Sequence, residues 1–181
     1  MLKWFRQGTS PYQTSLAMVG VKPGERVLLA GSPEPELAAQ LARLTGLNGQ
    51  TVAANQSPAS RAAIEAAAAA EGVLVDFAEA PPEQLPADDG LVDIVVLAVT
   101  STATTDPTWT GLLAAGFRSL RPGGRLIVIE GVRKSTFFGS SRPSPAPVDA
   151  VSPQLLAAGG RAARLLASAE GLTYYEAQKP R

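Results

Sequence analysis

The stretch LRPGGRLIVIE, residues 120–130, carries the clearest indication of the fold. Pro122 has no backbone N–H to donate, so it ends the helical pattern that precedes it. Gly123 and Gly124 then allow the chain to turn. The run that follows, residues 125–129, is mostly apolar and does not alternate with polar residues, which is typical of a parallel strand covered on both faces. The stretch therefore predicts a helix, a tight turn and a buried strand.

The same succession of helices and strands extends along the rest of the chain. A Ser-Pro or Asp-Pro pair, which can cap a helix and fit its first turn, begins at Ser10, Ser32, Ser57, Asp106 and Ser152. The predicted helices cover residues 11–19, 35–45, 58–71, 107–120 and 153–170. The predicted strands cover residues 26–30, 51–54, 73–77, 92–99, 125–129 and 173–177. This order predicts an α/β fold with a doubly wound, mostly parallel, Rossmann-like sheet and helices on both faces.

The length of 181 residues is that of one domain. We expect a single domain over residues 1–181, with an N-terminal extension at 1–10 and a Pro/Ser-rich loop at 135–148. The apolar stretch 91–99 is too short to span a bilayer, and the apolar region of a secretory signal does not follow the first basic residues. We therefore expect a cytoplasmic protein, with peripheral contact to a membrane as an option.

The sequence contains no cysteine and no histidine. This excludes disulfides, thiolate nucleophiles, an imidazole general base and metal sites built from Cys or His. We expect no metal site. Any chemistry would rest on carboxylates, hydroxyls, Lys or Tyr.

The order of segments over roughly residues 10–131 resembles that of class I S-adenosylmethionine-dependent methyltransferases of the ubiquinone/menaquinone-biosynthesis type. The resemblance rests on residues 120–130, on LPADDGLVDIVV at 85–96, and on residues 49–58. It implies a methyltransferase sheet whose first five strands are parallel in the order 3-2-1-4-5. We expect the family's C-terminal hairpin to be shortened, because few residues follow Gly171.

The cofactor motifs of the family are largely missing from this sequence. The family's acidic, glycine-rich turn after the first strand, Asp-x-Gly-x-Gly-x-Gly, aligns with LAGSPEP at residues 29–35. Leu29 replaces the acid, Pro33 and Pro35 replace two glycines, and only Gly31 remains. Glycines let a ligand approach the backbone and leave its N–H groups free, whereas a proline adds a ring and removes the donor.

Four further positions also argue against binding of the family's cofactor. Asn55 stands where the family has its ribose-binding acid, and the acid usually found after the third strand falls near Pro81. Glu34 and Glu36 place negative charge where the carboxylate of the cofactor would lie. We therefore expect no cofactor and no catalytic residue. If S-adenosylmethionine binds, the resemblance implies that Gly31, Ser32 and Asn55 contact it.

The sequence accordingly predicts a non-catalytic, methyltransferase-like accessory or structural subunit of a larger assembly, for which a membrane complex is one setting. The alternative is an active S-adenosylmethionine-dependent methyltransferase acting on a small molecule. A third alternative is a small-ligand binding module, in which the hydroxyl-rich run at residues 100–105 lines a site at the carboxyl edge of the sheet.

Charge and aromatic residues indicate where a partner would dock. Residues 62–117 contain nine acidic residues and no basic one, whereas residues 118–181 contain ten basic and four acidic residues. Segregated charge can orient docking. Aromatic residues are enriched at interface hot spots, and the candidates near basic residues are Trp4, Phe5, Phe137 and Phe138. We expect a protein partner with an acidic face or an anionic membrane surface, and no nucleic acid.

Overall fold

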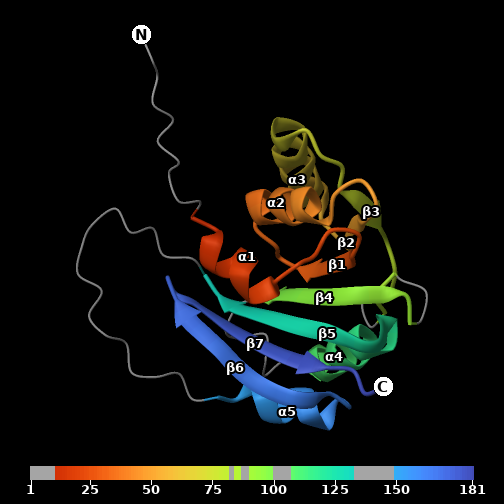
Figure 1. The fold of residues 1–181 in the computed structure, drawn as a ribbon, viewed down its shortest axis with the longest axis vertical. Helices are drawn as coiled ribbons and strands as arrows, with labels where there is room; N and C mark the ends of the chain where they lie inside the picture. The colour runs from red at the N-terminus through yellow and green to blue at the C-terminus, as the bar shows by residue number, and fades with distance from the viewer. Residues whose placement is uncertain (1–10, 82–83, 87–89, 100–106, 133–148) are drawn as a thin grey trace.

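The computed structural model of the protein describes residues 11–81, 84–86, 90–99, 107–132 and 149–181 (Figure 1). Its helices are α1 (Gln13–Val19), α2 (Pro35–Thr45), α3 (Pro58–Glu71), α4 (Pro107–Ser119) and α5 (Val151–Ala157). Its strands are β1 (Arg26–Gly31), β2 (Gln50–Ala54), β3 (Asp76–Ala78), β4 (Val92–Val99), β5 (Leu120–Gly131), β6 (Arg161–Ala169) and β7 (Leu172–Gln178).

The strands form one seven-stranded sheet in the order β3-β2-β1-β4-β5-β7-β6. The first five strands are parallel, and β7 is antiparallel to both β5 and β6. The predicted α/β class and the predicted order of the first five strands are therefore confirmed. Because β2 lies on one side of β1 and β4 on the other, the strand order reverses between β1 and β4, which is where open α/β sheets place their ligands.

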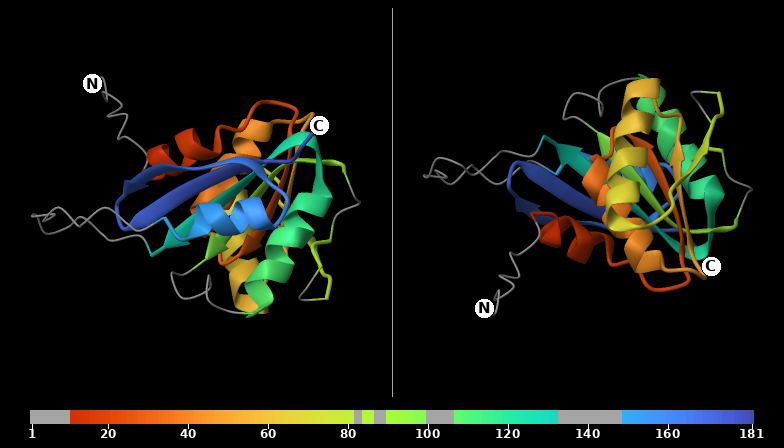
Figure 2. Two further views of the ribbon diagram at one scale, coloured as in Figure 1. Left: turned by 90° about the horizontal axis from the view of Figure 1, so that it is seen from below. Right: turned by 90° about the horizontal axis from the view of Figure 1, so that it is seen from above.

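The helices cover the two faces of the sheet in separate groups (Figure 2). Apolar residues of α1, α2 and α3, among them Val19, Leu41 and Ile64, form one core with one face of the sheet. Apolar residues of α4 and α5, among them Leu113 and Leu155, form a second core with the other face. Successive residues of the central strands point into the two cores in turn, which explains why these strands are apolar throughout.

The bounds of α2 and α3 agree with the sequence because their start signals are local. The side chain of Ser57 caps α3 by accepting a hydrogen bond from the backbone N–H of Ser60 at 3.2 Å. In α2, however, the capping position is Glu34, and Pro35 occupies the first turn. The expected cap at Ser32 is therefore wrong, as is the one at Ser152, which lies inside α5. Ser10 and Asp106 lie outside the described residues.

The predicted helix at 153–170 is wrong beyond its first turns. Helix α5 ends at Ala157, and residues 161–169 form β6, which pairs with β7 in a complete hairpin. The expected shortening of the hairpin is therefore also wrong. Gly159 has a φ of +100°, and a Cβ at Gly160 would lie 2.5 Å from the Phe117 ring. The chain thus turns at this pair, and pairing with β7 overrides the helix propensity of an Ala/Leu/Arg-rich segment.

Smaller differences occur at two other strands. Residues 73–75 belong to the exit from α3, where the N–H of Val73 donates to the carbonyl of Ala68 at 3.0 Å, so that β3 begins only at Asp76. Strand β5 includes the Pro-Gly-Gly turn because Leu120 already pairs with Val92 across a register shift. No helix in the described part of the chain is long and apolar enough to cross a membrane.

Candidate functional site

The carboxyl ends of β1 and β4 meet at the point where the strand order reverses. The backbone N–H of Ser32 donates to the carbonyl oxygen of Ala98 at 2.8 Å. Gly31 has a φ of +83°, and a Cβ there would lie only 2.1 Å from the same oxygen. The glycine that the sequence shares with the cofactor motif is thus required by the contact between two strands. This contact also engages the N–H of Ser32.

The side chain of Gln56 connects the carboxyl ends of β1 and β2 by hydrogen bonds. Its side chain is buried, and its Nε2 donates to the carbonyls of Ala54 at 2.7 Å and Gly31 at 3.2 Å. Its Oε1 accepts from the hydroxyl of Ser60 in α3 at 2.7 Å. Both ends of the amide are therefore engaged within the chain. Gln56 is not among the predicted site residues, although its place two residues after the buried strand β2 is a signal that could have identified it.

Asn55 joins the end of β2 to the segment after β3. Its backbone N–H donates to the carbonyl of Ala78 at 2.9 Å, and its side-chain Oδ1 accepts from the N–H of Ala80 at 2.7 Å. Its φ is +52°, a conformation that asparagine tolerates better than most residues. The acceptor oxygen that would face a ribose is thus used to connect two loops. Leu29, which replaces the acid of the first motif, is buried in the core between the sheet and α1–α3.

Negative charge gathers at the start of α2. The hydroxyl of Tyr12 donates to Glu36 at 3.2 Å. Burial, followed by the charges of Glu34 and Glu36, raises the pKa of Tyr12 well above its usual value, so the phenol keeps its proton. A helix N-terminus ordinarily favours an anion. Here Glu34 and Glu36 already place two carboxylates at the first turn, and their charge disfavours the carboxylate of an amino-acid ligand.

A second titratable pair lies at the end of β5, on the face covered by α4 and α5. The hydroxyl of Tyr175, a buried residue, donates to Glu130 at 3.3 Å. Burial raises the pKa of Glu130 above its usual value, although the hydrogen bond from Tyr175 acts in the opposite direction. Burial, then the charges of Glu130 and Asp149, raise the pKa of Tyr175 to about 12. The two side chains can share a proton at the carboxyl end of β5.

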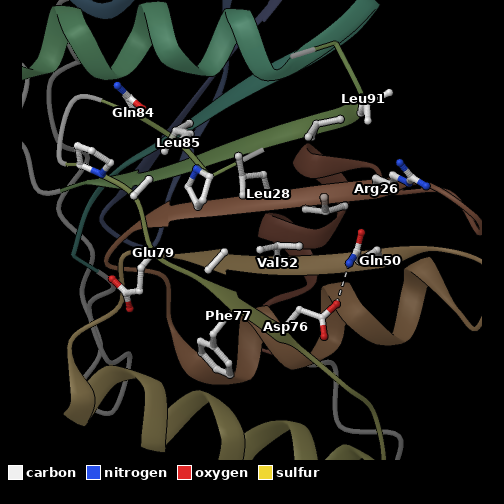
Figure 3. A pocket seen from close by; sticks show the side chains of 16 residues that line it. Arg26, Leu28, Gln50, Val52, Asp76, Phe77, Glu79, Gln84, Leu85 and Leu91 are labelled. Atoms are coloured by element: carbon white, nitrogen blue, oxygen red, sulfur yellow. Dashed lines mark hydrogen bonds between the residues drawn. The ribbon is translucent and has the colours of Figure 1, made fainter. Parts of the chain in front are cut away.

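A cavity of about 830 Å³ lies elsewhere, over β1, β2 and β3 on the face opposite α2 and α3 (Figure 3). Gly31, Ser32, Asn55 and Gln56 do not line it. Among the described residues, no group of three or more Asp or Glu side chains is arranged to hold a metal ion.

Several predicted positions lie outside the described residues. They are the aromatic candidates Trp4, Phe5, Phe137 and Phe138 and the hydroxyl-rich run at 100–105. The partner surface and the hydroxyl-lined site therefore stay predictions. Of the three predicted cofactor contacts, the structure brings Gly31 and Ser32 together, and Asn55 joins the neighbouring strand end.

Residues 27–124 match the sequence profile of a family described as "Methyltransferase domain". The chain belongs to this family. It is 35% identical over 118 residues to the ubiquinone/menaquinone biosynthesis C-methyltransferase UbiE of Teredinibacter turnerae, which covers 64% of this chain and 47% of the relative. It is 31% identical over 113 residues to UbiE of Vibrio vulnificus, covering 61% and 43%. The chain thus spans somewhat less than half the length of these curated relatives.

Solved structures of methyltransferases share the fold. A SAM-dependent methyltransferase from Aquifex aeolicus aligns with a TM-score of 0.70 at 20% identity, covering 93% of this chain and 89% of that one. A SAM-dependent O-methyltransferase from Thermotoga maritima aligns with a TM-score of 0.67 at 16% identity, covering 94% and 66%. The resemblance inferred from the sequence and the Rossmann-like methyltransferase fold are confirmed.

Membership in the family also bears on the predicted function and on the predicted absence of a cofactor. It supports a methyltransferase-like protein and favours the alternative, an S-adenosylmethionine-dependent methyltransferase, over a non-catalytic subunit. It likewise supports S-adenosylmethionine as the cofactor of the family and gives no support to the expectation of none. The residues at the carboxyl edge, however, do not fit that cofactor as the family motif would hold it, because their polar atoms are bonded to one another.

Proposed function

We propose that this methyltransferase-family domain does not use S-adenosylmethionine and acts as a non-catalytic accessory subunit of a larger assembly. The observation that carries the proposal is the side chain of Gln56, which is buried and bonded to the ends of β1, β2 and to α3. Glycine-rich turns of this fold leave backbone groups free for a ligand. In this chain the corresponding edge is closed by internal hydrogen bonds.

The energetic argument is one of competition. Displacing Gln56 would break three hydrogen bonds, each contributing about 1 kcal/mol net, and would leave strand-end carbonyls unpaired. The oxygen that would accept a hydrogen bond from a ribose hydroxyl, Oδ1 of Asn55, already accepts one from the N–H of Ala80. Glu34 and Glu36 add repulsion for a ligand carboxylate at the start of α2. Each cost is small, but all three oppose the same ligand.

The second candidate is an active S-adenosylmethionine-dependent methyltransferase that acts on a small molecule. The match of residues 27–124 to the methyltransferase domain family and the likeness to UbiE favour it. In this case Gly31, Ser32 and Asn55 would contact the cofactor. Gln56 would have to leave its buried position before the cofactor enters.

Calorimetric titration with S-adenosylmethionine and S-adenosylhomocysteine separates the two candidates. We expect no saturable heat up to about 1 mM and no rise in melting temperature, since a ligand at about 100 times its Kd would stabilise the fold by about 2.7 kcal/mol. Micromolar binding to the parent protein would contradict the first candidate and support the second. Gln56→Ala is the matched variant: binding gained only in this variant identifies the side chain as the obstacle.

The accessory role is tested through the predicted docking residues. We expect the protein to sediment with vesicles of phosphatidylcholine that contain phosphatidylglycerol, and to stay in solution with phosphatidylcholine alone, because anionic lipid attracts basic segments. The double variant Trp4→Ala/Phe5→Ala should weaken sedimentation. Equal behaviour with both vesicle types would count against an anionic membrane surface and leave an acidic protein face as the partner to be tested.

A further inference from the structure

The cavity over β1, β2 and β3 lies on the face of the sheet opposite α2 and α3 (Figure 3). Its walls are residues of these three strands, residues 79–81 and 84–86 of the segment after β3, and the start of β4. Val52, in the middle of β2, is only partly buried, although Ala53 and Ala54 beside it are fully buried. Leu91 at the mouth is 49% exposed. Apolar surface of the sheet therefore stays open to solvent.

The walls of the cavity are suited to an apolar body. Leu28, Val52 and Val92 line it from the sheet, and Leu85 with two prolines lines it from the segment after β3. Its volume of about 830 Å³ lies within the range of about 300–1,000 Å³ found for sites that bind small molecules. Covering this surface would be favourable at about 25 cal/mol for each Å² of apolar area.

The charges at the two ends of the cavity differ. Arg26 and Asp76 both line the end formed by the strand starts, where Asp76 also accepts a hydrogen bond from Gln50 at 2.8 Å. Glu79 lies at the opposite end (Figure 3) and is exposed. Within the part of the chain that the structure describes, no cation forms an ion pair with Glu79. Of the residues that line the cavity, Arg26 is the only basic one and it lies at the other end, so the negative charge of Glu79 has no neighbouring base in the lining.

We propose that this cavity binds a small organic cation, an amine with a flat apolar body, whose ammonium group lies near Glu79. The apolar body would cover the exposed part of Val52 and Leu91. The ammonium group would meet a carboxylate that forms no ion pair with another described residue. At the other end Arg26 disfavours an ammonium group only in part, because Asp76 lines the same end.

The cavity adjoins the carboxyl edge at Ala78 and Ala80, which are hydrogen-bonded to Asn55, but Asn55 and Gln56 do not line it. Its occupation does not depend on S-adenosylmethionine.

The test compares three probes of the same shape. We titrate the full chain with naphthylmethylamine, naphthylmethanol and naphthylacetate and follow backbone amide signals by NMR at low salt. The expected result is a set of shifts confined to the cavity, at Ala78, Glu79 and Val92, with the amine bound about tenfold more tightly than the acid. The preference should shrink as salt screens the exposed carboxylate. Equal affinity for amine and acid would overturn the proposal.

Two variants and a control locate the site. Val52→Phe fills the cavity from the sheet side and should abolish binding of all three probes, whereas Leu47→Phe, at a fully exposed position, should leave binding unchanged. Glu79→Gln should lower the affinity for the amine several-fold and leave the alcohol unaffected. This second variant decides the question if Val52→Phe fails to fold. Two results would contradict the assignment. One is chemical-shift changes at the Gln56 amide in place of the cavity residues, and the other is unchanged affinity for the amine in Glu79→Gln.

Discussion

Gly31 is the residue at which the close contact of two strand ends can be tested directly. A Cβ at this position would lie 2.1 Å from the carbonyl oxygen of Ala98, and the φ of +83° is unfavourable for other residues. We expect Gly31→Ala to lower the free energy of unfolding by about 3 kcal/mol, through the combined clash and backbone strain. The measurement is urea unfolding followed by circular dichroism.

The matched control for this substitution is Gly72→Ala. Gly72 also has a positive φ, +68°, in the left-handed helical region, but a Cβ there would meet no atom within 4 Å. Only the backbone strain should remain, at about 1 kcal/mol. Equal losses in the two variants would show that contact with Ala98 is unimportant.

Tyr175 predicts a specific alkaline destabilisation. Because its pKa is raised from 10.0 to about 12 in the folded protein, the unfolded chain loses the phenol proton first. This contribution to stability is fully present below pH 10 and is lost as the pH rises from 10 to about 12. Tyr175→Phe should therefore show a shallower fall in the free energy of unfolding across this interval. Parallel curves for the parent and the variant would contradict the raised pKa.

At the residue scale, sequence patterns predicted which residues lie at the carboxyl edge of the sheet, but not the hydrogen bonds that these residues form. Gly31, Ser32 and Asn55 do lie at the carboxyl ends of adjacent strands, because strand ends can be read from local apolar runs. The bonds of Gln56 could not be predicted, because one of its acceptors, the carbonyl of Gly31, is 25 positions away in the chain. Such a contact depends on strand order and register, which no local pattern specifies.

Among the secondary-structure elements, β5, β6 and β7 are tied to α1 by one buried carboxylate. Glu176 is 5% exposed and accepts from Arg164 at 2.7 Å and from Arg125 at 3.4 Å. Arg125 also donates to the carbonyl of Gly20 at the end of α1. Because Arg164 is 65% exposed and Arg125 is 23% exposed, water can solvate both cations in the variant. Glu176→Gln should therefore cost about 1–2 kcal/mol in chemical unfolding, through the lost charge-assisted hydrogen bonds.

An exposed pair provides the comparison for this variant. Arg61 and Glu65 lie one turn apart on α3, with their atoms 2.9 Å apart and both side chains about half exposed. Such pairs contribute less than about 0.5 kcal/mol. Glu65→Gln should therefore be nearly neutral. A loss as small in Glu176→Gln would mean that the network at the hairpin does not stabilise the fold.

The irregular start of β6 offers a substitution that should stabilise the fold. Ala162 has a φ of +52° where the register with β7 shifts. An L-residue is disfavoured in this conformation by about 1 kcal/mol, and glycine is not. We expect Ala162→Gly to leave stability unchanged or raise it by up to about 1 kcal/mol in urea unfolding. Ala167→Gly, at a paired position of the same strand, should be destabilising.

Elements marked by local signals in the sequence were predictable, whereas a strand whose residues favour a helix was not. Helices α2 and α3 have the predicted bounds because proline and glycine mark their ends in the sequence itself. Strand β6 was mistaken for helix because its residues favour a helix, and only the hydrogen bonds to β7 make it a strand. The signal that could have found it is the Gly159-Gly160 pair.

For the whole molecule, the sharing of one sheet by two cores predicts cooperative unfolding. β4 and β5 contribute residues to both cores, so neither core can be lost while the other is kept. In Trp4→Phe, the remaining tryptophan is Trp109, a buried residue of α4. Its fluorescence and the circular dichroism of the backbone should follow the same urea transition. Transitions with different midpoints would indicate that the cores unfold separately.

Because β7 lies between β5 and β6 in the sheet, the strands are synthesised in a different order from the one in which they pair. β6 leaves the ribosome before β7, yet β7 is its partner in the described sheet. Until Leu172 and the residues after it are available, β5 presents an open edge and β6 has no strand to pair with. An open apolar edge readily pairs with another chain. A premature stop just before Leu172 would therefore expose an interior strand, and the shortened product should self-associate during translation.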